Sequence, residues 1–232
     1  FQGTSFASWA VSQNMKTAVL VVDQSTSYSI GLARAFKKEF EKQGVKLLKE
    51  LKISSGDKDF KAIVSQINSL NPDLVYMPFY HPEAALLVRQ ARQIGVKSQF
   101  ASGDGVSNDT FIELASDASN GYLYTDAFDS SNPPTAKSKA FVEAYAKENG
   151  DSNVPGFTAL GADSYYLMVD AMNRCADGAD RECVNKEIKK SKNFEGVSGI
   201  INIDKKGNAE RSIVIKEIAG GKAMYKDTVN PK

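Results

Sequence analysis

The stretch DLVYMPFYHPEAALLVRQARQIG, residues 73–95, decides the fold, because an apolar run of strand length turns directly into a helix. Apolar residues at helical spacing predict the buried stripe of that helix, namely Leu87, Ala91 and Ile94. Pro82 suits the first helical position, and Glu83 suits the positive end of the helix dipole. The chain's only histidine, His81, is therefore expected at the surface beside the start of the helix and outside any site.

The same order of strand and helix repeats along the first part of the chain. Apolar runs predict strands at residues 16–23, 45–53, 73–80, 98–105 and 121–128. Helical stripes follow the first two strands: Ala33, Phe36 and Phe40, ended by Gly44, and then Phe60, Ile63, Val64 and Ile67, capped by Asp59 and ended by Asn71 and Pro72. Strands that alternate with helices form right-handed crossovers and a parallel sheet that is covered on both faces. The predicted fold class is therefore α/β, with a doubly wound parallel sheet.

The pattern changes after SSNPPT, residues 130–135, where a Pro-Pro pair breaks the chain. Helices are predicted at 136–149, 157–174 and 180–190, followed by two short strands about a turn at Lys206, Gly207 and Asn208. We therefore divide the chain into residues 1–126, 127–205 and 206–232. A helical block without strands of its own needs a sheet to pack against, so we expect it to expose apolar side chains, among them Leu167, Met168 and Met172.

Charge and hydropathy argue against two classes of partner. The chain has 29 basic and 28 acidic side chains, so no net field attracts it to nucleic acid or to an anionic membrane. No apolar run approaches the roughly 18 residues of a membrane span, so we expect no direct membrane insertion. The sequence also shows no nucleophile elbow, phosphate-binding loop or metal-ligand set, so we predict no catalytic residue, no metal and no cofactor.

Both cysteines, Cys175 and Cys183, lie in RCADGADREC, residues 174–183, which is predicted to form a loop between two helices. Their short separation allows a disulfide that closes a small loop and stabilises the fold by at most roughly 2–3 kcal/mol. Such a bond implies an oxidising compartment, and the alternative is a pair of reduced cysteines. A zinc site is not expected, because His81 lies far away in the sequence and does not complete a four-ligand set.

Four blocks carry a resemblance to a known family: DQSTSYSIGLARAFKKEFEKQG (23–44), SSGDKDFKAIVSQINSLNPDLVYMPFYHPEAALLVRQARQIG (54–95), QFASGDGVSNDTF (99–111) and GFTALGADSYYLMVDAM (156–172). Together they resemble the periplasmic substrate-binding proteins of branched-chain amino-acid ABC transporters, the type I leucine/isoleucine/valine class. The resemblance covers essentially the whole chain and implies two doubly wound lobes, each with strand order 2-1-3-4-5, that close on a ligand. It also implies that this chain holds the second lobe and the helices returning to the first, without the first lobe's N-terminal segment.

The resemblance places the candidate ligand contacts at Tyr28, Tyr80 and Asp104. In the implied strand order these residues follow strands one, three and four, whose loops converge at the carboxyl edge of the sheet. Phe157 corresponds to an aromatic contact from the returning helices, and the family more commonly has the longer glutamate at the position of Asp104. The alternatives are ordinary half-buried tyrosines at strand ends and, for the aspartate, a turn residue between two glycines.

The function that the resemblance implies is a non-catalytic periplasmic receptor. Such a protein captures a small aliphatic amino acid and delivers it to a membrane ABC permease. Two alternatives stay open: a type I sensory domain that reports a ligand to a signalling partner, and a doubly wound enzyme that uses Asp104 as a general base. Acid–base catalysis usually needs at least two positioned groups, and the only histidine is already assigned to a helix start. The receptor is therefore the favoured hypothesis.

Overall fold

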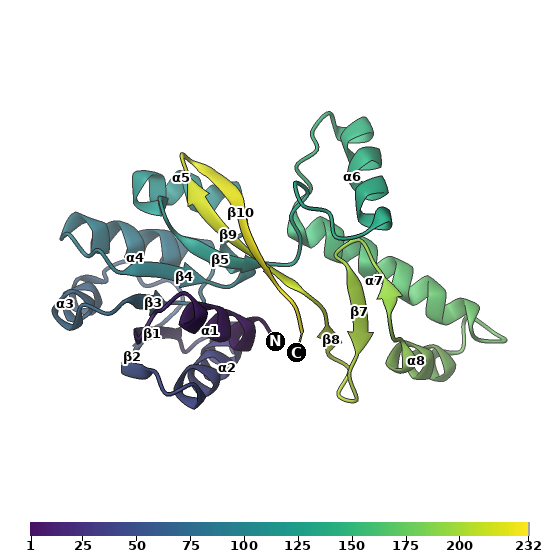
Figure 1. The fold of residues 1–232 in the computed structure, drawn as a ribbon, viewed down its shortest axis with the longest axis horizontal. Helices are drawn as coiled ribbons and strands as arrows, with labels where there is room; N and C mark the ends of the chain where they lie inside the picture. The colour runs from purple at the N-terminus through teal and green to yellow at the C-terminus, as the bar shows by residue number, and fades with distance from the viewer. Residues whose placement is uncertain (232) are drawn as a thin grey trace. The chain divides into compact units, whose positions relative to one another are not determined.

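The structure is a computed structural model that describes residues 1–231 (Figure 1). Contacts between residues divide the chain into two compact units. The first unit comprises Phe1–Asp126 and Ile215–Val229, and the second comprises Ala127–Val214 together with Asn230 and Pro231. The assignment of segments 1–126, 127–205 and 206–232 to the lobes of a two-lobed protein stays a prediction.

A seven-stranded sheet forms the first unit's framework, with strand order β10-β9-β5-β4-β3-β1-β2. Its strands are β1 (Thr17–Asp23), β2 (Lys46–Ile53), β3 (Leu74–Tyr76), β4 (Gln99–Ser102), β5 (Leu123–Asp126), β9 (Ile213–Ala219) and β10 (Lys222–Val229). Neighbouring strands from β1 to β5 pair in parallel. Their order, 2-1-3-4-5, is the one that the family resemblance implied, so the predicted doubly wound sheet is confirmed.

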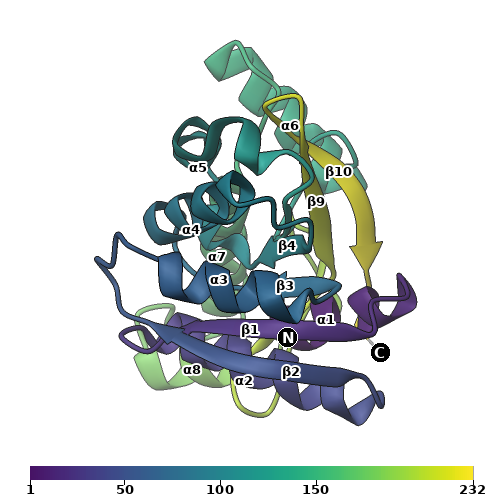
Figure 2. The ribbon, with the colours of Figure 1, turned by 90° about the vertical axis from the view of Figure 1, so that its left-hand side faces the viewer.

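Helices cover both faces of this sheet (Figure 2). They are α1 (Gln2–Ser12), α2 (Ser27–Lys42), α3 (Lys61–Leu70), α4 (His81–Gln93) and α5 (Asp109–Ala115), with 3₁₀ turns η1 (Asp104–Val106) and η2 (Ser116–Ser119). Helices α3, α4 and α5 pack on one face, where their apolar side chains join one core cluster with the strands. On the other face, the ring of Tyr76 lies 5.3 Å from that of Phe6 in α1 and 4.3 Å from that of Phe36 in α2. Covered on both sides, β3 is apolar throughout, and β1 is apolar between Thr17 and Asp23 at its two ends.

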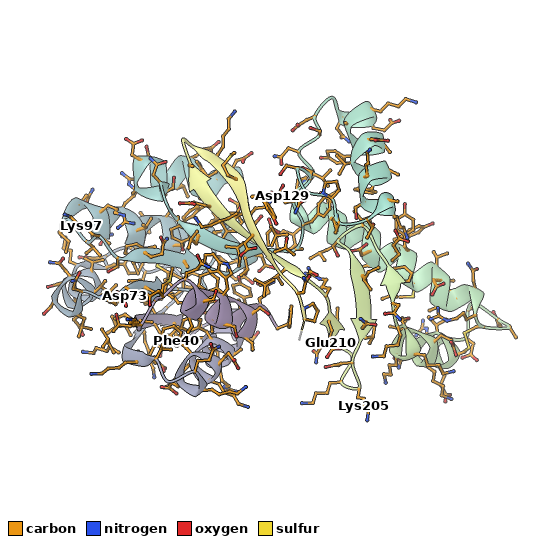
Figure 3. The ribbon with its side chains drawn as sticks, viewed as in Figure 1. Phe40, Asp73, Lys97, Asp129, Lys205 and Glu210 are labelled. Carbon is orange, nitrogen blue, oxygen red and sulfur yellow. A yellow bond between two sulfur atoms is a disulfide. The ribbon has the colours of Figure 1, made fainter. Side chains whose placement is uncertain are left out.

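Asp73, labelled in Figure 3, forms hydrogen bonds between the start of β1 and the start of β3. Its Oδ2 accepts hydrogen bonds from the backbone N–H groups of Lys16 and Thr17 and from Thr17 Oγ1, at 2.9, 2.8 and 2.9 Å. Burial opposes the ionised carboxylate, but these hydrogen bonds outweigh it and lower the pKa of Asp73. The contacts hold the entrance to β1 against the residue that precedes β3.

Two predictions about the segment 73–95 need correction. The third strand ends at Tyr76 rather than at Tyr80, because Pro78 has no N–H group with which to continue the ladder. Ile94 does not belong to the buried stripe of α4: it follows the last helical turn and is 49% exposed, whereas the other two predicted residues are fully buried. The fourth and fifth strands are also shorter than predicted.

The start of α3 differs from the sequence prediction as well. Phe60, and not Asp59, is the N-cap residue of this helix. The Asp59 carboxylate still accepts a hydrogen bond from the N–H of Lys61, at 3.0 Å, so it supports the first turn from one position earlier. The predicted apolar positions of the helix do face the core.

Helix α1 and strand β10 were not predicted from the sequence. Most residues of α1 from Gly3 to Ala10 are buried, so the helix lacks the polar face that makes an amphipathic pattern visible. Strand β10 is exposed along most of its length, so it shows no alternation. The two elements meet where the indole N–H of Trp9 donates to Asp227 Oδ2 at 2.8 Å.

The second unit contains three helices and a small sheet among the described residues. The helices are α6 (Ala136–Asn149), α7 (Gly156–Asn173) and α8 (Arg181–Lys190), each within one residue of its predicted bounds. The sheet has the order β6-β7-β8, formed by Phe194–Glu195, Ile200–Ile203 and Ala209–Glu210. The predicted strand pair about the turn at 206–208 is present, and its strands are antiparallel. Strand β6 was not predicted, because a strand of two residues shows no period in the sequence.

Helix α7 exposes a row of large apolar side chains. Phe157, Tyr165, Met168 and Met172 are 58%, 65%, 45% and 38% exposed. Their spacing of three, four and eight residues along the helix places them on one face. The expected exposure of apolar groups in this block is therefore found, at Met168 and Met172 among others, while Leu167 is partly buried.

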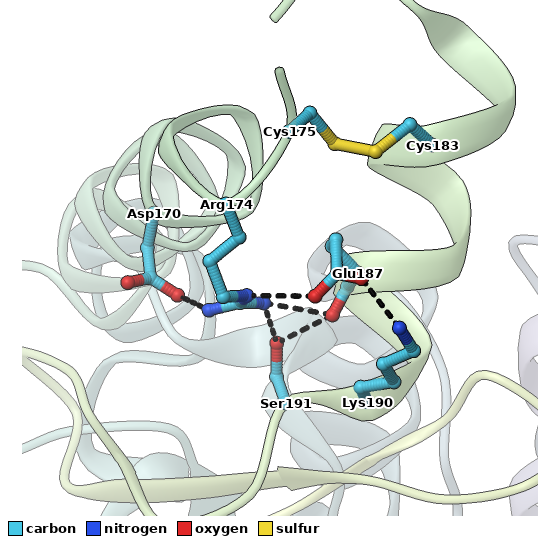
Figure 4. Close-up of polar contacts among 7 residues, drawn as sticks. All are labelled: Asp170, Arg174, Cys175, Cys183, Glu187, Lys190 and Ser191. Carbon is cyan, nitrogen blue, oxygen red and sulfur yellow. Dashed lines mark hydrogen bonds and ion pairs between the residues drawn. A yellow bond between two sulfur atoms is a disulfide. The ribbon is translucent and has the colours of Figure 1, made fainter.

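A disulfide and a polar network join α7 to α8 (Figure 4). Cys175 and Cys183 are bonded, as predicted, with their Cα atoms 6.1 Å apart. The guanidinium of Arg174 forms an ion pair with Asp170 and donates to Glu187 Oε2 at 3.0 Å and to the Glu187 carbonyl oxygen at 2.7 Å. The end of α7 is thus held to α8 by contacts that do not depend on the disulfide.

Candidate functional site

Three loops at the carboxyl edge of the sheet bring the predicted residues Tyr28, Tyr80 and Asp104 together. Tyr28 lies in the first turn of α2, Tyr80 is the N-cap of α4, and Asp104 begins the η1 turn after β4. The two tyrosine rings stack with centroids 4.9 Å apart. Tyr28 Oη donates a hydrogen bond to Asp104 Oδ1 at 3.0 Å.

The topology of the sheet explains why these loops meet. Strands β1 and β3 are neighbours, but the helices that follow them, α2 and α4, cover opposite faces. Ligands of doubly wound sheets bind at such a point, beyond the carboxyl ends of the strands, and the loops after these strands border the same place. Tyr28 and Tyr80 follow these two strands, and Asp104 follows the next strand in the sheet.

Glycines on either side of Asp104 allow its loop to approach Tyr28. A Cβ atom added at Gly103 would lie 2.5 Å from Tyr28 Oη. One added at Gly105 would lie 2.6 Å from the carbonyl oxygen of Phe79. Both distances are under 3.0 Å. At Gly105 the obstacle is backbone, so this position requires glycine, whereas a side chain at Gly103 would displace the hydroxyl of Tyr28.

The carboxylate of Asp104 is buried, with 9% of the residue exposed, and both of its oxygens accept hydrogen bonds from neutral groups. Besides the Tyr28 hydroxyl on Oδ1, the amide Nε2 of Gln2 donates to Oδ2 at 2.7 Å. The amide oxygen of Gln2 in turn accepts a hydrogen bond from Thr125 Oγ1 at 2.9 Å. Among residues 1–231, no lysine or arginine forms an ion pair with Asp104. Its negative charge is therefore hydrogen-bonded but not balanced by a cation of the described chain.

The hydroxyl groups of the two tyrosines differ in their hydrogen bonds within the described chain. Burial, together with the charge of Asp104, raises the pKa of Tyr28 far above its usual value, so its hydroxyl stays a neutral donor. Tyr28 Oη also accepts a hydrogen bond from the N–H of Gly105 at 2.8 Å, which locks it in place. Tyr80 is 47% exposed, and its hydroxyl forms no hydrogen bond with the described residues. It can therefore serve a ligand.

Glu83 has the local role that the sequence indicated, but the helix begins one residue earlier than predicted, at His81 instead of Pro82. His81 is the first residue of α4 and lies beside Asn108, with 3.3 Å between Nδ1 and the amide nitrogen. Glu83 stands in the first turn of the same helix and accepts a hydrogen bond from the N–H of Gly56 at 2.7 Å. Phe157 lies in the second unit, in the first turn of α7. Its role as a ligand contact stays a prediction.

Gln2 and Thr125 are the residues of this arrangement that sequence reasoning missed. Thr125 is a hydroxyl residue inside a buried strand, and a polar side chain in such a strand is a signal of a polar site. Gln2 offered no such signal, because the helix that carries it was not predicted.

The described residues form neither a metal site nor a membrane-spanning helix. Within the described residues, no three histidine, cysteine, aspartate or glutamate side chains are grouped so that they could hold a metal ion. No helix in the same part of the chain combines the length and the apolar character needed to span a bilayer.

Comparison with known proteins assigns the chain to a family. The sequence profile of the periplasmic binding protein family matches residues 2–222. The chain belongs to this family. Among curated relatives, the leucine-, isoleucine-, valine-, threonine- and alanine-binding protein of Pseudomonas aeruginosa is 33% identical over 190 residues, which are 82% of this chain and 50% of that protein. A Leu/Ile/Val-binding protein of Rhizobium johnstonii is 30% identical over 82% of this chain and 51% of its own length.

Solved structures of periplasmic binding proteins show the same fold. The leucine-binding protein LivK of Thermotoga maritima superposes with a TM-score of 0.93 at 37% identity, covering 100% of this chain and 65% of that one. The branched-chain amino-acid binding protein LivJ of Streptococcus pneumoniae, solved in complex with isoleucine, gives a TM-score of 0.85 at 26% identity over the same shares. The chain spans about half the length of the curated relatives that it matches.

Proposed function

We propose that this chain is part of a periplasmic receptor that binds a free branched-chain amino acid and delivers it to a membrane ABC permease. The observation that carries the proposal is the buried carboxylate of Asp104, which has two neutral donors and no cationic partner in the described chain. The ammonium group of an amino acid would supply the missing positive charge. The names of the relatives support the same ligand class, since they include proteins that bind leucine, isoleucine and valine.

Each residue of the site has a distinct part in this proposal. Asp104 accepts the ammonium group, and a charged pair of this kind is favourable where water is excluded, provided that each charge keeps its partner. Tyr28 holds the carboxylate and stays neutral. Tyr80, whose hydroxyl has no partner in the described chain, donates to the ligand or accepts from it. Phe157 is proposed as an additional aromatic contact.

The proposed receptor carries out no chemical step. The two groups that donate to Asp104 are a phenol with a strongly raised pKa and an amide. Both are neutral, and they hold the charged carboxylate in place instead of moving a proton. An aspartate in place of the longer glutamate draws the ammonium group closer to the backbone of η1. We therefore propose that the pocket for the ligand's side chain is shifted relative to relatives that carry glutamate.

Calorimetric titration with leucine and with 4-methylpentanoate tests the role of the ammonium group, because the second compound is leucine without it. The full-length protein that carries this chain is used, so that both sides of the ligand are held. We expect leucine, isoleucine or valine to bind, and 4-methylpentanoate to bind at least a hundredfold more weakly, on the scale of a lost buried charge pair. Comparable binding of leucine and 4-methylpentanoate would refute an ammonium site at Asp104.

A further inference from the structure

A chain of hydrogen bonds runs from Thr125 through Gln2 to Asp104, and it joins three segments of the first unit. Thr125 lies in β5, Gln2 begins α1, and Asp104 begins η1. The bonds measure 2.9 Å from Thr125 Oγ1 to Gln2 Oε1 and 2.7 Å from Gln2 Nε2 to Asp104 Oδ2. We propose that Gln2 is a positioning residue for the ligand's ammonium group, which acts by fixing the carboxylate of Asp104, and that Thr125 holds the amide of Gln2 in the required orientation. This inference rests on the proposed function.

The polarity of the chain follows from the charge at its end. An ionised carboxylate only accepts hydrogen bonds, so the group 2.7 Å from Oδ2 has to be the Nε2 donor of Gln2. The amide oxygen then faces Thr125, and the hydroxyl of Thr125 donates to it. If the amide were turned over, its oxygen would lie against the carboxylate oxygen and repel it. Both hydrogen bonds, from Thr125 to Gln2 and from Gln2 to Asp104, are therefore donated in the direction of the carboxylate.

The two donors on Asp104 restrain the carboxylate without neutralising it. Gln2 holds Oδ2 and Tyr28 holds Oδ1, so rotation of the carboxylate would break both bonds. Neither donor carries a charge, and the full negative charge stays available to a cationic ligand. A charged donor in place of Gln2 would satisfy the oxygen equally well, but it would take the place of the ammonium group electrostatically. A glutamine therefore suits this position better than a lysine or an arginine.

Gln2→Met is the main test, because it keeps the length of the side chain and removes the donor. We expect leucine to bind roughly tenfold more weakly, the scale of one hydrogen bond to a charged group. Thr125→Val keeps the volume, removes the hydroxyl and should weaken binding about two- to fivefold. It also tests the same chain if Gln2→Met does not fold. Gln13→Met is the matched control, since Gln13 follows the end of α1 and its side chain donates only to Ser12, at 3.4 Å. It should bind leucine within twofold of wild type.

A double-mutant cycle with Asp104→Asn separates positioning from a merely structural role. If Gln2 acts through Asp104, Gln2→Met should cost less than twofold once Asp104 has lost its charge. An equal loss in both backgrounds, or leucine affinity within twofold of wild type in both Gln2→Met and Thr125→Val, would overturn the inference. If Asp104→Asn alone binds leucine like wild type, the proposed ammonium site itself fails. The two failures are therefore distinguishable.

Discussion

Replacement of Asp104 by asparagine removes the charge of the site and one acceptor oxygen, and it keeps the shape of the side chain. The new amide side chain can keep its oxygen toward Gln2 Nε2 and turn its nitrogen toward Tyr28 Oη. The hydroxyl oxygen of Tyr28 accepts from the N–H of Gly105 and has a second lone pair free for the new donor. The Tyr28 O–H group then loses Asp104 Oδ1 as its acceptor, so we expect the free energy of unfolding to fall by about 1 kcal/mol.

The effect on amino-acid binding should be much larger. Asp104 is 9% exposed and has no cationic partner among the described residues, so an ammonium group bound there would lose the negative charge that it pairs with. Breaking a buried charge pair in this way costs roughly 2–4 kcal/mol, or about 30- to 700-fold in affinity. Tyr80→Phe should cost only about 1 kcal/mol, because one neutral hydrogen bond is at stake.

Calorimetry of the full-length protein with leucine, isoleucine and valine measures this loss, and thermal unfolding of the same samples reports the fold. Asp109→Asn is the matched control: it removes the same charge from an exposed residue of the next helix, and binding should stay unchanged. The reasoning is refuted if Asp104→Asn binds within twofold of wild type. In that case the ligand brings no cation to this carboxylate, and an uncharged ligand becomes the better hypothesis.

Three further predictions concern stability. Gly105→Ala should lower the free energy of unfolding, measured by urea titration, by about 1–3 kcal/mol, because the added Cβ would lie 2.6 Å from a carbonyl oxygen. Gly31→Ala is the control: its added Cβ would have nothing within 4 Å, so this variant should be neutral or stabilising. Asp73→Asn should cost roughly 1 kcal/mol at pH 7, discounted for its exposure. Because the pKa of Asp73 is lowered in the folded state, the carboxylate's contribution to stability is complete above about pH 4 and is lost as the pH falls. The difference in stability between Asp73→Asn and wild type should therefore vanish near pH 2, and a difference that stays constant with pH would contradict these hydrogen bonds. Replacing both Cys175 and Cys183 by serine should cost at most about 2.5 kcal/mol in urea unfolding, the scale for a small closed loop, and a larger loss would show that the polar network does not hold α7 to α8 by itself.

Local patterns in the sequence determined the order of strands and helices in much of the chain. A continuous apolar run such as that of β1 indicates a strand covered on both faces, and stripes such as Phe36 and Phe40 indicate the inner side of a helix. These signals depend on neighbours a few residues apart, so they can be read without the fold. The short separation of Cys175 and Cys183 made their disulfide predictable for the same reason. Elements without a polar side, such as α1, or without a buried side, such as β10, left no such pattern.

The partners of the buried carboxylate were decided only by the tertiary structure. The resemblance named Asp104 but not the two residues that donate to it. Gln2 lies 102 positions before Asp104 in the chain, and Tyr28 lies 76 positions before it. No periodicity links positions that far apart. They meet because the sheet order places β1, β3 and β4 side by side, and because Gly103 and Gly105 let one loop close on another. The sequence has 29 basic side chains, and none of those within residues 1–231 forms an ion pair with this carboxylate. The proposed function depends on the absence of such a partner, which follows from the packing and not from the composition.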